Sequence, residues 1–298
     1  MAEESHNYNC AITGASGYVG SRISAYLSRK GWSIYELNHG TRNPAKNNGP
    51  VIDYSLDRAI SSITLRGINV LIHCAYDFRP LHWERINEVN VKGSVQLFDA
   101  ANKAGVKKII FISTMSAFNG CKSIYGKAKL EIETEALKIG ATVIRPGLVF
   151  GNDAGGLIAA LCQMVCAAKF IPLIGRGNQV LHLVHEQDLC RLVYKIAQNE
   201  GAIFSKPIVA ASERGKTLKQ ILSVLTDIQK KKVVFIPIPW VLVWSGLKLA
   251  ETVGLRVAFR SDSLISLLNQ EQNPDFGLTR RTGIAFREFD STSLLSPT

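Results

Sequence analysis

The chain lacks the cysteine and histidine patterns of a metal centre. Its six cysteines form no Cys-x-x-Cys pair, and none has a histidine at the spacing of a zinc ligand set, so no metal is expected. The first residues, Met1–His6, are polar and acidic, unlike a signal peptide. We therefore expect reduced thiols in a cytoplasmic protein.

A long apolar run is also missing. The most apolar stretch, Val233–Leu247, is followed by Lys248 and is too short for a helix that spans a membrane. The expectation for 233–255 is a helix in the core or in an interface. The alternative is a helix that lies on a membrane surface, which Trp240, Trp244 and the basic run before them favour.

Acidic residues are in deficit, with 24 Asp and Glu against 35 Lys and Arg, which gives a formal net charge of +11. A basic protein attracts polyanions. The positive charge is scattered, however, and its longest run is Lys230–Lys232. A protein that binds nucleic acid gathers its charge on one element. We therefore expect an anionic small molecule, and not a nucleic acid, as the partner.

The first half of the chain alternates apolar strand signals with helical spacing, which predicts a parallel sheet with crossover helices. The expected strands are Asn9–Thr13, Ser33–Leu37, Val51–Asp53, Val70–Ala75, Lys108–Ser113 and one from Thr142; the expected helices are Tyr18–Lys30, Glu84–Ala104 and Tyr125–Lys138.

After Gly151 this rhythm breaks, and helices are expected at Leu157–Ala168, Leu218–Gln229 and Ser263–Leu268. The predicted class is α/β, a Rossmann-type doubly wound parallel sheet with a smaller mixed α/β C-terminal lobe. The expected dinucleotide-binding domain covers 1–153. The expected substrate-binding lobe covers 154–298, with 178–200 returning to the sheet.

A glycine-rich turn, Thr13–Gly20, follows the first strand and opens the first helix. Gly14 permits a tight turn, Gly17 lets the backbone approach a pyrophosphate, and Gly20 lets the helix pack on the strand. The free N–H groups of the helix then face an anion. The turn predicts a dinucleotide site, with Ser16, Tyr18 and Val19 as further cofactor contacts.

An acid at the end of the second strand, which would bind the ribose of NAD, is absent. The chain has Asn38 there, with Arg42 shortly after, and Arg22 lies early in the first helix. Either guanidinium could pair with a 2′-phosphate, so NADP is favoured over NAD. Asp53, with Tyr54 beside it, is expected near the adenine.

Tyr125 and Lys129 lie four residues apart and therefore share one helix face. An ammonium beside a phenol lowers the phenol pKa. Such a tyrosine can give a proton to a carbonyl oxygen as hydride arrives, or take it back. The strand that ends in Ile112–Ser116 supplies hydroxyls that could hold the substrate oxygen.

These pieces together resemble the extended short-chain dehydrogenases/reductases, the branch with nucleotide-sugar epimerases, dehydratases and 4-keto-sugar reductases. The matching segments cover nearly the whole chain and include Thr13–Gly20, Asp53, Ile72–Ala75, Asn90–Gly93, Ile112–Thr114, Tyr125–Lys129, Arg145–Gly151, Val184–Asp188 and Asp275–Phe286.

The resemblance implies that Tyr125 is the acid/base, that Lys129 binds the nicotinamide ribose and lowers the tyrosine pKa, and that Thr114 is the active hydroxyl, with Ser116 as alternative. It also implies that the protein is a homodimer and that Arg145 has a structural role and does not contact the substrate. The further cofactor contacts that it implies are Cys74, Ala75, Asn90, Ser113, Pro146 and Leu148.

Two features depart from the nucleotide-sugar pattern. Ten residues separate Thr114 from Tyr125, where those enzymes carry a longer loop, which leaves the substrate open. Met115 and Ser116 replace the acidic pair that sugar dehydratases need to eliminate water, so dehydration is not expected.

Other polar residues are candidates for substrate contacts. His82 follows the fourth strand, and Arg176, Arg256 and Arg260 could bind a substrate diphosphate. His73 ends a buried strand and is expected to be a hydrogen-bonded core histidine. Three functions remain open: an NAD(P)-dependent oxidoreductase of a nucleoside-diphosphate sugar, a reductase of a hydrophobic ketone such as a steroid or flavonoid, and a non-catalytic nucleotide-binding scaffold or redox sensor.

Overall fold

The computed structural model describes residues 8–38, 50–151, 156–199, 201–255 and 259–292. Arg42 and Arg256, and the proposed boundary between 153 and 154, lie outside these residues.

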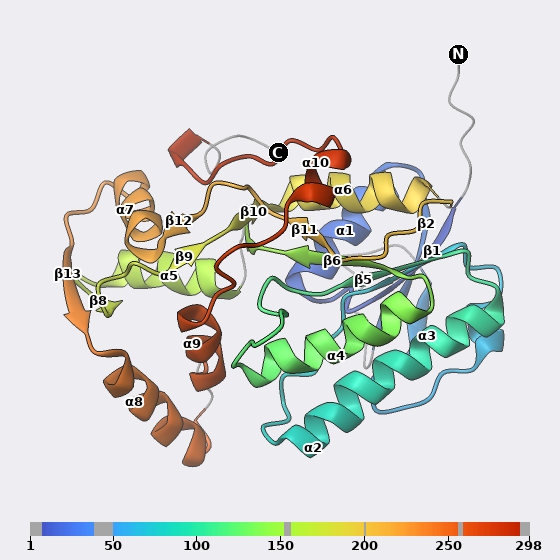
Figure 1. Cartoon of the computed structure of the whole chain (residues 1–298), viewed down its shortest axis with the longest axis horizontal. Coiled ribbons are helices and arrows are strands. Elements are labelled where there is room, and N and C mark those ends of the chain that lie inside the picture. The colour runs from blue at the N-terminus through green and yellow to red at the C-terminus, as the bar shows by residue number, and fades with distance from the viewer. Residues whose placement is uncertain (1–7, 39–49, 152–155, 200, 256–258, 293–298) are drawn as a thin grey trace.

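Seven parallel strands form a central sheet in the order β11-β6-β5-β4-β1-β2-β3 (Figure 1). This arrangement confirms the predicted doubly wound parallel sheet. The strand order reverses between β1 and β4, and such a switch point opens a crevice at the carboxyl ends of the strands. The strands are β1 (Asn9–Thr13), β2 (Ser33–Asn38), β3 (Val51–Asp53), β4 (Val70–His73), β5 (Lys108–Ile112), β6 (Thr142–Pro146) and β11 (Ile208–Ala210).

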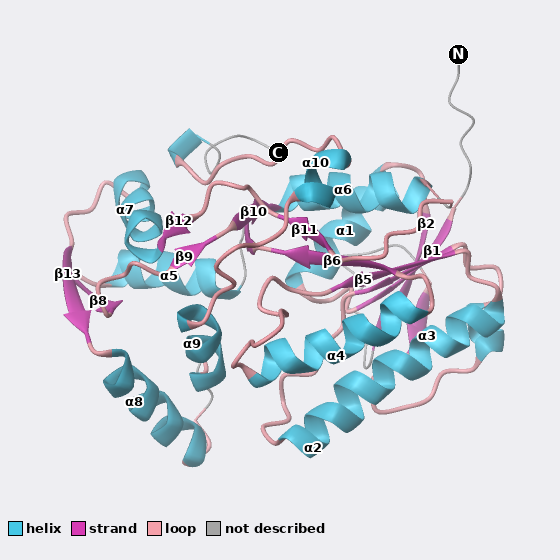
Figure 2. Ribbon diagram, viewed as in Figure 1, coloured by secondary structure: helices cyan, strands magenta, loops and turns pink. Residues whose placement is uncertain are grey.

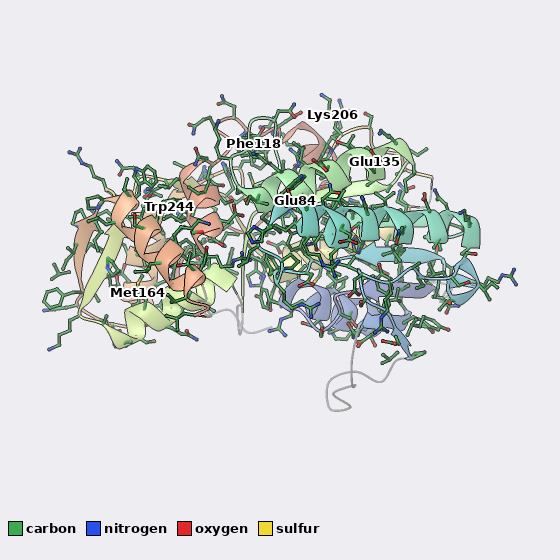
Figure 3. All side chains as sticks on the ribbon, turned by 90° about the horizontal axis from the view of Figure 1, so that it is seen from below. Glu84, Phe118, Glu135, Met164, Lys206 and Trp244 are labelled. Carbon is green, nitrogen blue, oxygen red and sulfur yellow. The ribbon has the colours of Figure 1, made fainter. Side chains whose placement is uncertain are left out.

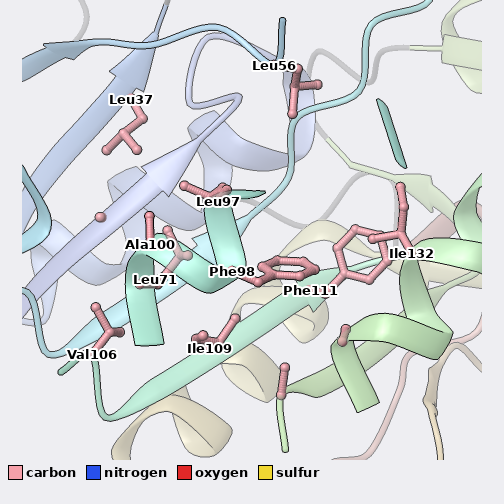
Figure 4. Packing of buried hydrophobic residues seen from close by; sticks show 14 of the residues in the cluster. Leu37, Leu56, Leu71, Leu97, Phe98, Ala100, Val106, Ile109, Phe111 and Ile132 are labelled. Carbon is pink, nitrogen blue, oxygen red and sulfur yellow. The ribbon is translucent and has the colours of Figure 1, made fainter. Parts of the chain in front are cut away.

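Helices cover both faces of this sheet (Figure 2). On one face lie α1 (Tyr18–Arg29) and α6 (Glu186–Gln198), and on the other lie α3 (Gly93–Ala104) and α4 (Ile124–Lys138). Strand and helix side chains pack together between the sheet and the helices α3 and α4, where Leu71, Phe98, Phe111 and Ile132 are buried (Figure 4). This packing holds α4, which carries Tyr125 and Lys129, against the sheet.

The helix predicted over Glu84–Ala104 is divided. It begins as α2 (Trp83–Ile86), widens to a π-helical segment over Asn87–Lys92, and continues as α3. Wide turns of this kind are frequent at functional sites. Asn90 lies on this segment, and its side chain bonds both the N–H and the carbonyl of Asp77.

The smaller lobe has a core of its own, which includes Val165, Ile171 and Ile221. Strand β7 (Leu148–Phe150) pairs with β10 (Leu183–His185) where the two parts meet, and α6 and β11 then return to the large sheet. The lobe elements are α5 (Gly156–Ala167), β8 (Phe170–Ile174), β9 (Val180–Leu181), β12 (Lys216–Thr217), α7 (Leu218–Ile228), β13 (Val234–Ile238), α8 (Trp240–Thr252) and α9 (Ser261–Leu268). The short helices η1 (Ser62–Leu65) and α10 (Gly277–Arg281) complete the fold.

The apolar run from Val233 differs from the expectation of a core helix. It divides into strand β13 and helix α8, and none of the residues of α8 is buried. The core alternative of the expectation is therefore wrong for α8, because the lobe core is closed by α5 and α7 instead, and the interface alternative stays a prediction. Within the described residues, no helix combines the length and hydropathy needed to cross a bilayer.

Close packing of α1 on the glycine turn generates the first prediction. A Cβ on Gly20 would stand 2.2 Å from the carbonyl oxygen of Gly14, which is backbone and cannot swing aside. We expect Gly20→Ala to lower the free energy of unfolding by about 1–3 kcal/mol in a denaturant titration.

Gly246→Ala is the matched control, because a Cβ there, on exposed α8, meets nothing within 4 Å. Alanine should stabilise that helix by up to about 1 kcal/mol. Similar effects at both positions would contradict the packing described for the turn.

Candidate functional site

Two cavities meet at the carboxyl ends of the central strands. The first, of about 770 Å³, extends from the glycine turn to Lys129 and Pro146. The second, of about 620 Å³, lies between this region and the smaller lobe. Thr114 and Tyr125 line both cavities. The structure therefore brings the hydroxyl and the phenol to the junction of two spaces that could hold two ligands.

The glycine turn is built around close backbone contacts. Gly14 has φ +67°, and a Cβ there would stand 2.9 Å from the amide nitrogen of Ala75. Helix α1 begins after Gly17 with no side-chain cap and no acidic residue in its first turn. The N–H groups and dipole of the helix N-terminus are thus available to an anion, and this cradle fits a dinucleotide phosphate.

A chain of buried hydrogen bonds joins the ends of β1 and β4. The Thr13 hydroxyl oxygen accepts the N–H groups of Cys74 and Ala75, so its own hydrogen goes to Nδ1 of His73 at 2.6 Å. Nε2 of His73 then donates to Ser94 at 2.8 Å. Burial lowers the His73 pKa to about 3, which keeps the ring neutral. His73 is therefore the core histidine that was expected.

Tyr125 and Lys129 point toward the first cavity from α4, but their electrostatics differ from the expectation. Burial raises the pKa of Tyr125 to about 12, and a hydrogen bond from Thr114 partly offsets this rise. Burial also lowers the pKa of Lys129 to about 8. The Lys129 ammonium donates to the Ile112 carbonyl at 2.9 Å. The Thr114 hydroxyl thus favours the phenolate.

A buried carboxylate lies one turn beyond Lys129. Glu133 accepts a hydrogen bond from Ser113 and a bidentate pair from Arg145, with the shortest N–O distance 2.7 Å. Burial raises the Glu133 pKa, and Arg145 opposes that shift. Ser113 lines the first cavity but is held by this pair, and Arg145 packs structurally, as the sequence predicted.

The smaller lobe reaches the start of α4 through Asp262. Its carboxylate accepts the backbone N–H of Ile124 at 2.7 Å and that of Tyr125 at 3.0 Å. A carboxylate at a helix N-terminus satisfies free donors and complements the helix dipole. Asp262 is 137 residues from Tyr125, so no local pattern indicated this contact.

An aromatic group covers the Tyr125 ring. Tyr76 contacts it edge-on, with 4.8 Å between ring centroids, and Phe78 stacks on it at 5.5 Å. The backbone carbonyl of Phe78 accepts a hydrogen bond from Arg260 at 2.7 Å. Neither aromatic residue was predicted from the sequence, because both come shortly after β4 on a segment without regular structure.

Most of the predicted cofactor contacts lie together. The first cavity is lined by Gly14, Ser16, Gly17, Tyr18, Val19, Asn38, Tyr54, Cys74, Ala75, Ser113, Pro146 and Leu148, in addition to Thr114, Tyr125 and Lys129. Asp57, which the sequence analysis did not single out, joins this lining.

Five predicted residues lie outside the linings of both cavities, and one of them, Arg22, pairs with Glu186. Asp53 is an exposed partner of Arg58 at the end of β3, and Asn90 instead anchors the backbone of Asp77. His82 is the N-cap position of α2, and Arg176 is exposed beyond β8. The other two substrate candidates, Ser116 and Arg260, do line the second cavity.

The fold and the Tyr–Lys grouping define a protein of the extended short-chain dehydrogenase/reductase class. The pattern of the NAD dependent epimerase/dehydratase family matches residues 10–209, more than half of the chain. The chain belongs to this family.

Three comparisons illustrate the likeness. The UDP-glucose 4-epimerase of Vibrio cholerae is 28% identical over 194 residues, which are 54% of this chain and 57% of that protein. The ceramide reductase of Caulobacter vibrioides is 26% identical over 186 residues, 60% of this chain and 57% of the relative. The chain thus spans little more than half the length of these relatives. The structure of MoeE5 in complex with UDP-glucose and NAD has a TM-score of 0.68 at 18% identity, covers 78% of this chain and 85% of its own, and shares the fold.

Burial of Lys129 predicts a variant that gains stability. The folded pKa, about 8, is below the usual 10.5, so between these values the unfolded chain binds a proton that the folded chain has released. Stability due to this group therefore rises with pH in that range, and its full penalty applies below pH 8. We expect Lys129→Met to melt at a higher temperature than the wild type at neutral pH. Its free energy of unfolding should be greater by about 1–2 kcal/mol.

This advantage should shrink as the pH rises from about 8 toward 10.5. Melting curves of both proteins across this range measure it. Lys127→Met, on the exposed face of the same helix, is the control, and an equal pH response in that variant would contradict the assignment to Lys129.

The Asp262 contact gives a third prediction. Asp262→Ala should lower the free energy of unfolding by about 1–2 kcal/mol, because two N–H groups at the start of α4 lose their acceptor. Asp262→Asn retains one acceptor oxygen, so its free energy of unfolding should lie between those of the wild type and Asp262→Ala. Asp275→Ala is the matched control, because that exposed carboxylate also accepts a backbone N–H, from Gly277. No difference between Asp262→Ala and the wild type in a denaturant titration would contradict the role.

Proposed function

We propose that the chain is an NAD(P)-dependent oxidoreductase that acts on a nucleoside-diphosphate sugar, either by reducing a 4-keto group or by epimerising C4. The observation that carries this proposal is that Thr114 and Tyr125 line both cavities. A group that must exchange a proton with a substrate, next to a dinucleotide, needs that position. Membership of the epimerase/dehydratase family supports the same chemistry.

The first cavity would hold the dinucleotide. Its phosphates would contact the glycine turn and the first N–H groups of α1, and its adenosine end would lie toward Asn38 and Tyr54. The opposite end, between Lys129 and Pro146, would hold the nicotinamide riboside. When bound, a nicotinamide supplies or accepts the hydride.

The protein supplies the proton. Tyr125 would give its phenolic proton to the substrate oxygen during reduction and recover it during oxidation. Thr114 would donate a hydrogen bond to the phenolate as it forms, in line with its effect on the Tyr125 pKa. Lys129, with a pKa of about 8, would bind the ribose hydroxyls and hold a positive charge near the phenolate.

A preference for NADP is also proposed, on narrower grounds. Strand β2 ends in Asn38, and its one carboxylate, on Glu36, is buried and accepts a hydrogen bond from Asn38. Such a carboxylate does not face the ribose of a bound NAD. The expected pairing of Arg22 with the 2′-phosphate of NADP carries less weight, because its guanidinium pairs with Glu186 at 3.0 Å.

The second cavity would hold the sugar and its diphosphate. Arg260 is placed to contact phosphate oxygens there, and Ser116, Ser263 and Ser266 offer hydroxyls to a sugar. The relative from Vibrio cholerae, a UDP-glucose 4-epimerase, supports this substrate class. Conversion of a 4-keto sugar needs no further acid, in line with Met115 and Ser116 after Thr114.

A hydrophobic carbonyl substrate is the second candidate. Much of the second cavity is apolar, with Phe78, Leu81, Leu148, Phe259 and Leu267 in its lining. The relative named ceramide reductase supports this class. A bound steroid-like or lipid-like ketone would bury this surface, whereas a sugar would leave it in contact with polar groups.

We also propose a cytoplasmic homodimer. All six cysteines are free thiols, which a reducing compartment preserves. The dimer rests on the resemblance to the extended short-chain enzymes.

Replacement of the Tyr125 hydroxyl tests the proposal. Tyr125→Phe should reduce kcat by about a hundredfold or more, because the proton donor is gone. Its affinity for the dinucleotide should stay within about twofold, because the phenyl ring preserves the lining of the cavity. Tyr26→Phe, on α1 and outside both cavities, should behave as the wild type. A non-catalytic scaffold would instead keep its full function in Tyr125→Phe.

The assay follows oxidation of NADPH with a panel of nucleoside-diphosphate 4-keto sugars and with apolar ketones. Turnover of a keto sugar supports reduction, and retained NAD with interconversion of sugars supports epimerisation. Turnover of apolar ketones alone would replace the sugar proposal with the second candidate. Full activity of Tyr125→Phe on any of these substrates would overturn the assigned acid/base.

A further inference from the structure

Helix α8 of the smaller lobe lies at the end of the molecule away from β1 and β2 (Figure 1). The helix contributes Trp240, Val241, Leu242 and Leu249 to an apolar surface, and each is more than 40% exposed. No residue of α8 is buried. Trp244 lies on the same helix (Figure 3), but it is half-buried. An exposed apolar helix of this kind indicates an interaction site.

The two-stranded sheet that precedes α8 extends this surface. Strands β8 and β13 pair in parallel, with Val234 beside Phe170 and Ile236 beside Pro172. These four side chains are exposed, while the alternate residues of β8 are buried in the lobe core. A sheet with one face in water ordinarily carries polar residues there. The outer side of β8 and β13, together with α8, is called the α8 face below.

Positive charge surrounds the α8 face. The segments 156–185 and 228–250, which build it, contain no aspartate or glutamate. Their cationic residues are Lys169, Arg176, Lys230, Lys231, Lys232 and Lys248. Of the acids that flank these segments, Asp227 is exposed, Glu186 pairs with Arg22, and Glu251 pairs with Lys248 at 3.6 Å and accepts the N–H and hydroxyl of Ser261. Apolar side chains within a cationic rim complement a surface that is both apolar and anionic.

A second copy of the chain fits this surface less well. A two-fold contact brings the same patch of each subunit together. The lysines of one copy would then face the lysines of the other, with no acid in either segment to compensate. Like charges in contact are destabilising.

We propose that the α8 face docks on a lipid bilayer that carries anionic headgroups. Helix α8 has 13 residues and is about 20 Å long, shorter than the ~30 Å hydrocarbon core, so it would lie in the plane of the interface. The exposed Trp240 would lie at headgroup level, where indole rings are favoured. Lys230, Lys232 and Lys248 would contact the headgroups.

Docking would also orient the second cavity. Helix α9 packs against α8 and places Ser263, Ser266 and Leu267 in the lining of that cavity. A docked chain would therefore hold the second cavity one helix away from the bilayer.

Vesicle flotation of the full chain tests this proposal. The protein is mixed with vesicles of phosphatidylcholine alone or of phosphatidylcholine and phosphatidylglycerol in equal parts. We expect flotation with the anionic vesicles and little with the neutral ones. Added salt should weaken binding, because it screens the lysines.

Two variants probe the two parts of the surface. Lys230→Gln with Lys232→Gln should reduce the partition coefficient about 25-fold, or roughly fivefold per lysine. Trp240→Ser with Leu242→Ser should reduce it at least about tenfold, because both apolar contacts are lost. The matched controls, Lys103→Gln with Lys206→Gln and separately Ile203→Ser, change exposed residues outside the α8 face and should bind as the wild type. Unchanged thermal melting shows that each variant is folded.

Three outcomes would overturn the proposal. They are equal flotation with neutral and anionic vesicles, no flotation with either, and equal losses in the α8-face variants and the controls. Sedimentation velocity tests whether a second copy of the chain occupies the α8 face instead. A dimer that dissociates in Trp240→Ser with Leu242→Ser, in a protein that does not float, would assign the α8 face to a second copy instead.

Discussion

The contact between the ends of β1 and β4 is the constraint on which the rest of the site depends. The backbone of Gly14 lies so close to Ala75 that a side chain has no room, and the Thr13 hydroxyl holds both amides that follow β4. This junction opens the crevice at the switch point of the sheet. It also sets where the chain after β4 begins its path, and with it the aromatic cover over Tyr125.

On the opposite side of the crevice, helix α4 buries two ionisable groups, and their burial costs free energy of folding. Lys129 and Glu133 lie one turn apart on α4, both buried, and burial shifts the pKa of each toward its neutral form. Hydrogen bonds from Ser113 and Arg145 hold the carboxylate, and the Ile112 carbonyl holds the ammonium. Buried ionic groups of this kind are typical of sites whose chemistry needs shifted pKa values. The smaller lobe adds Asp262, so the start of α4 depends on both parts of the chain.

Features with a local cause could be predicted from the sequence, and features that depend on distant packing could not. The glycine turn, β1 and the parallel sheet follow from short patterns, and they lie where they were expected. Asp262 is brought to Tyr125 by the fold alone. The pKa of Tyr125 reflects a balance between burial and neighbours that spacing does not contain. The exposure of α8 was equally hidden, because an apolar sequence does not show whether its own chain covers it.

The central claim is that the first cavity binds a nicotinamide dinucleotide with its reactive end at Tyr125. The most direct measurement is the total dinucleotide held by the purified chain, as the amount released on denaturation plus the amount taken up in a calorimetric titration with NADP or NAD. We expect one dinucleotide per chain, bound with a Kd in the micromolar range or below. The absence of both released nucleotide and saturable uptake at micromolar concentration would contradict it.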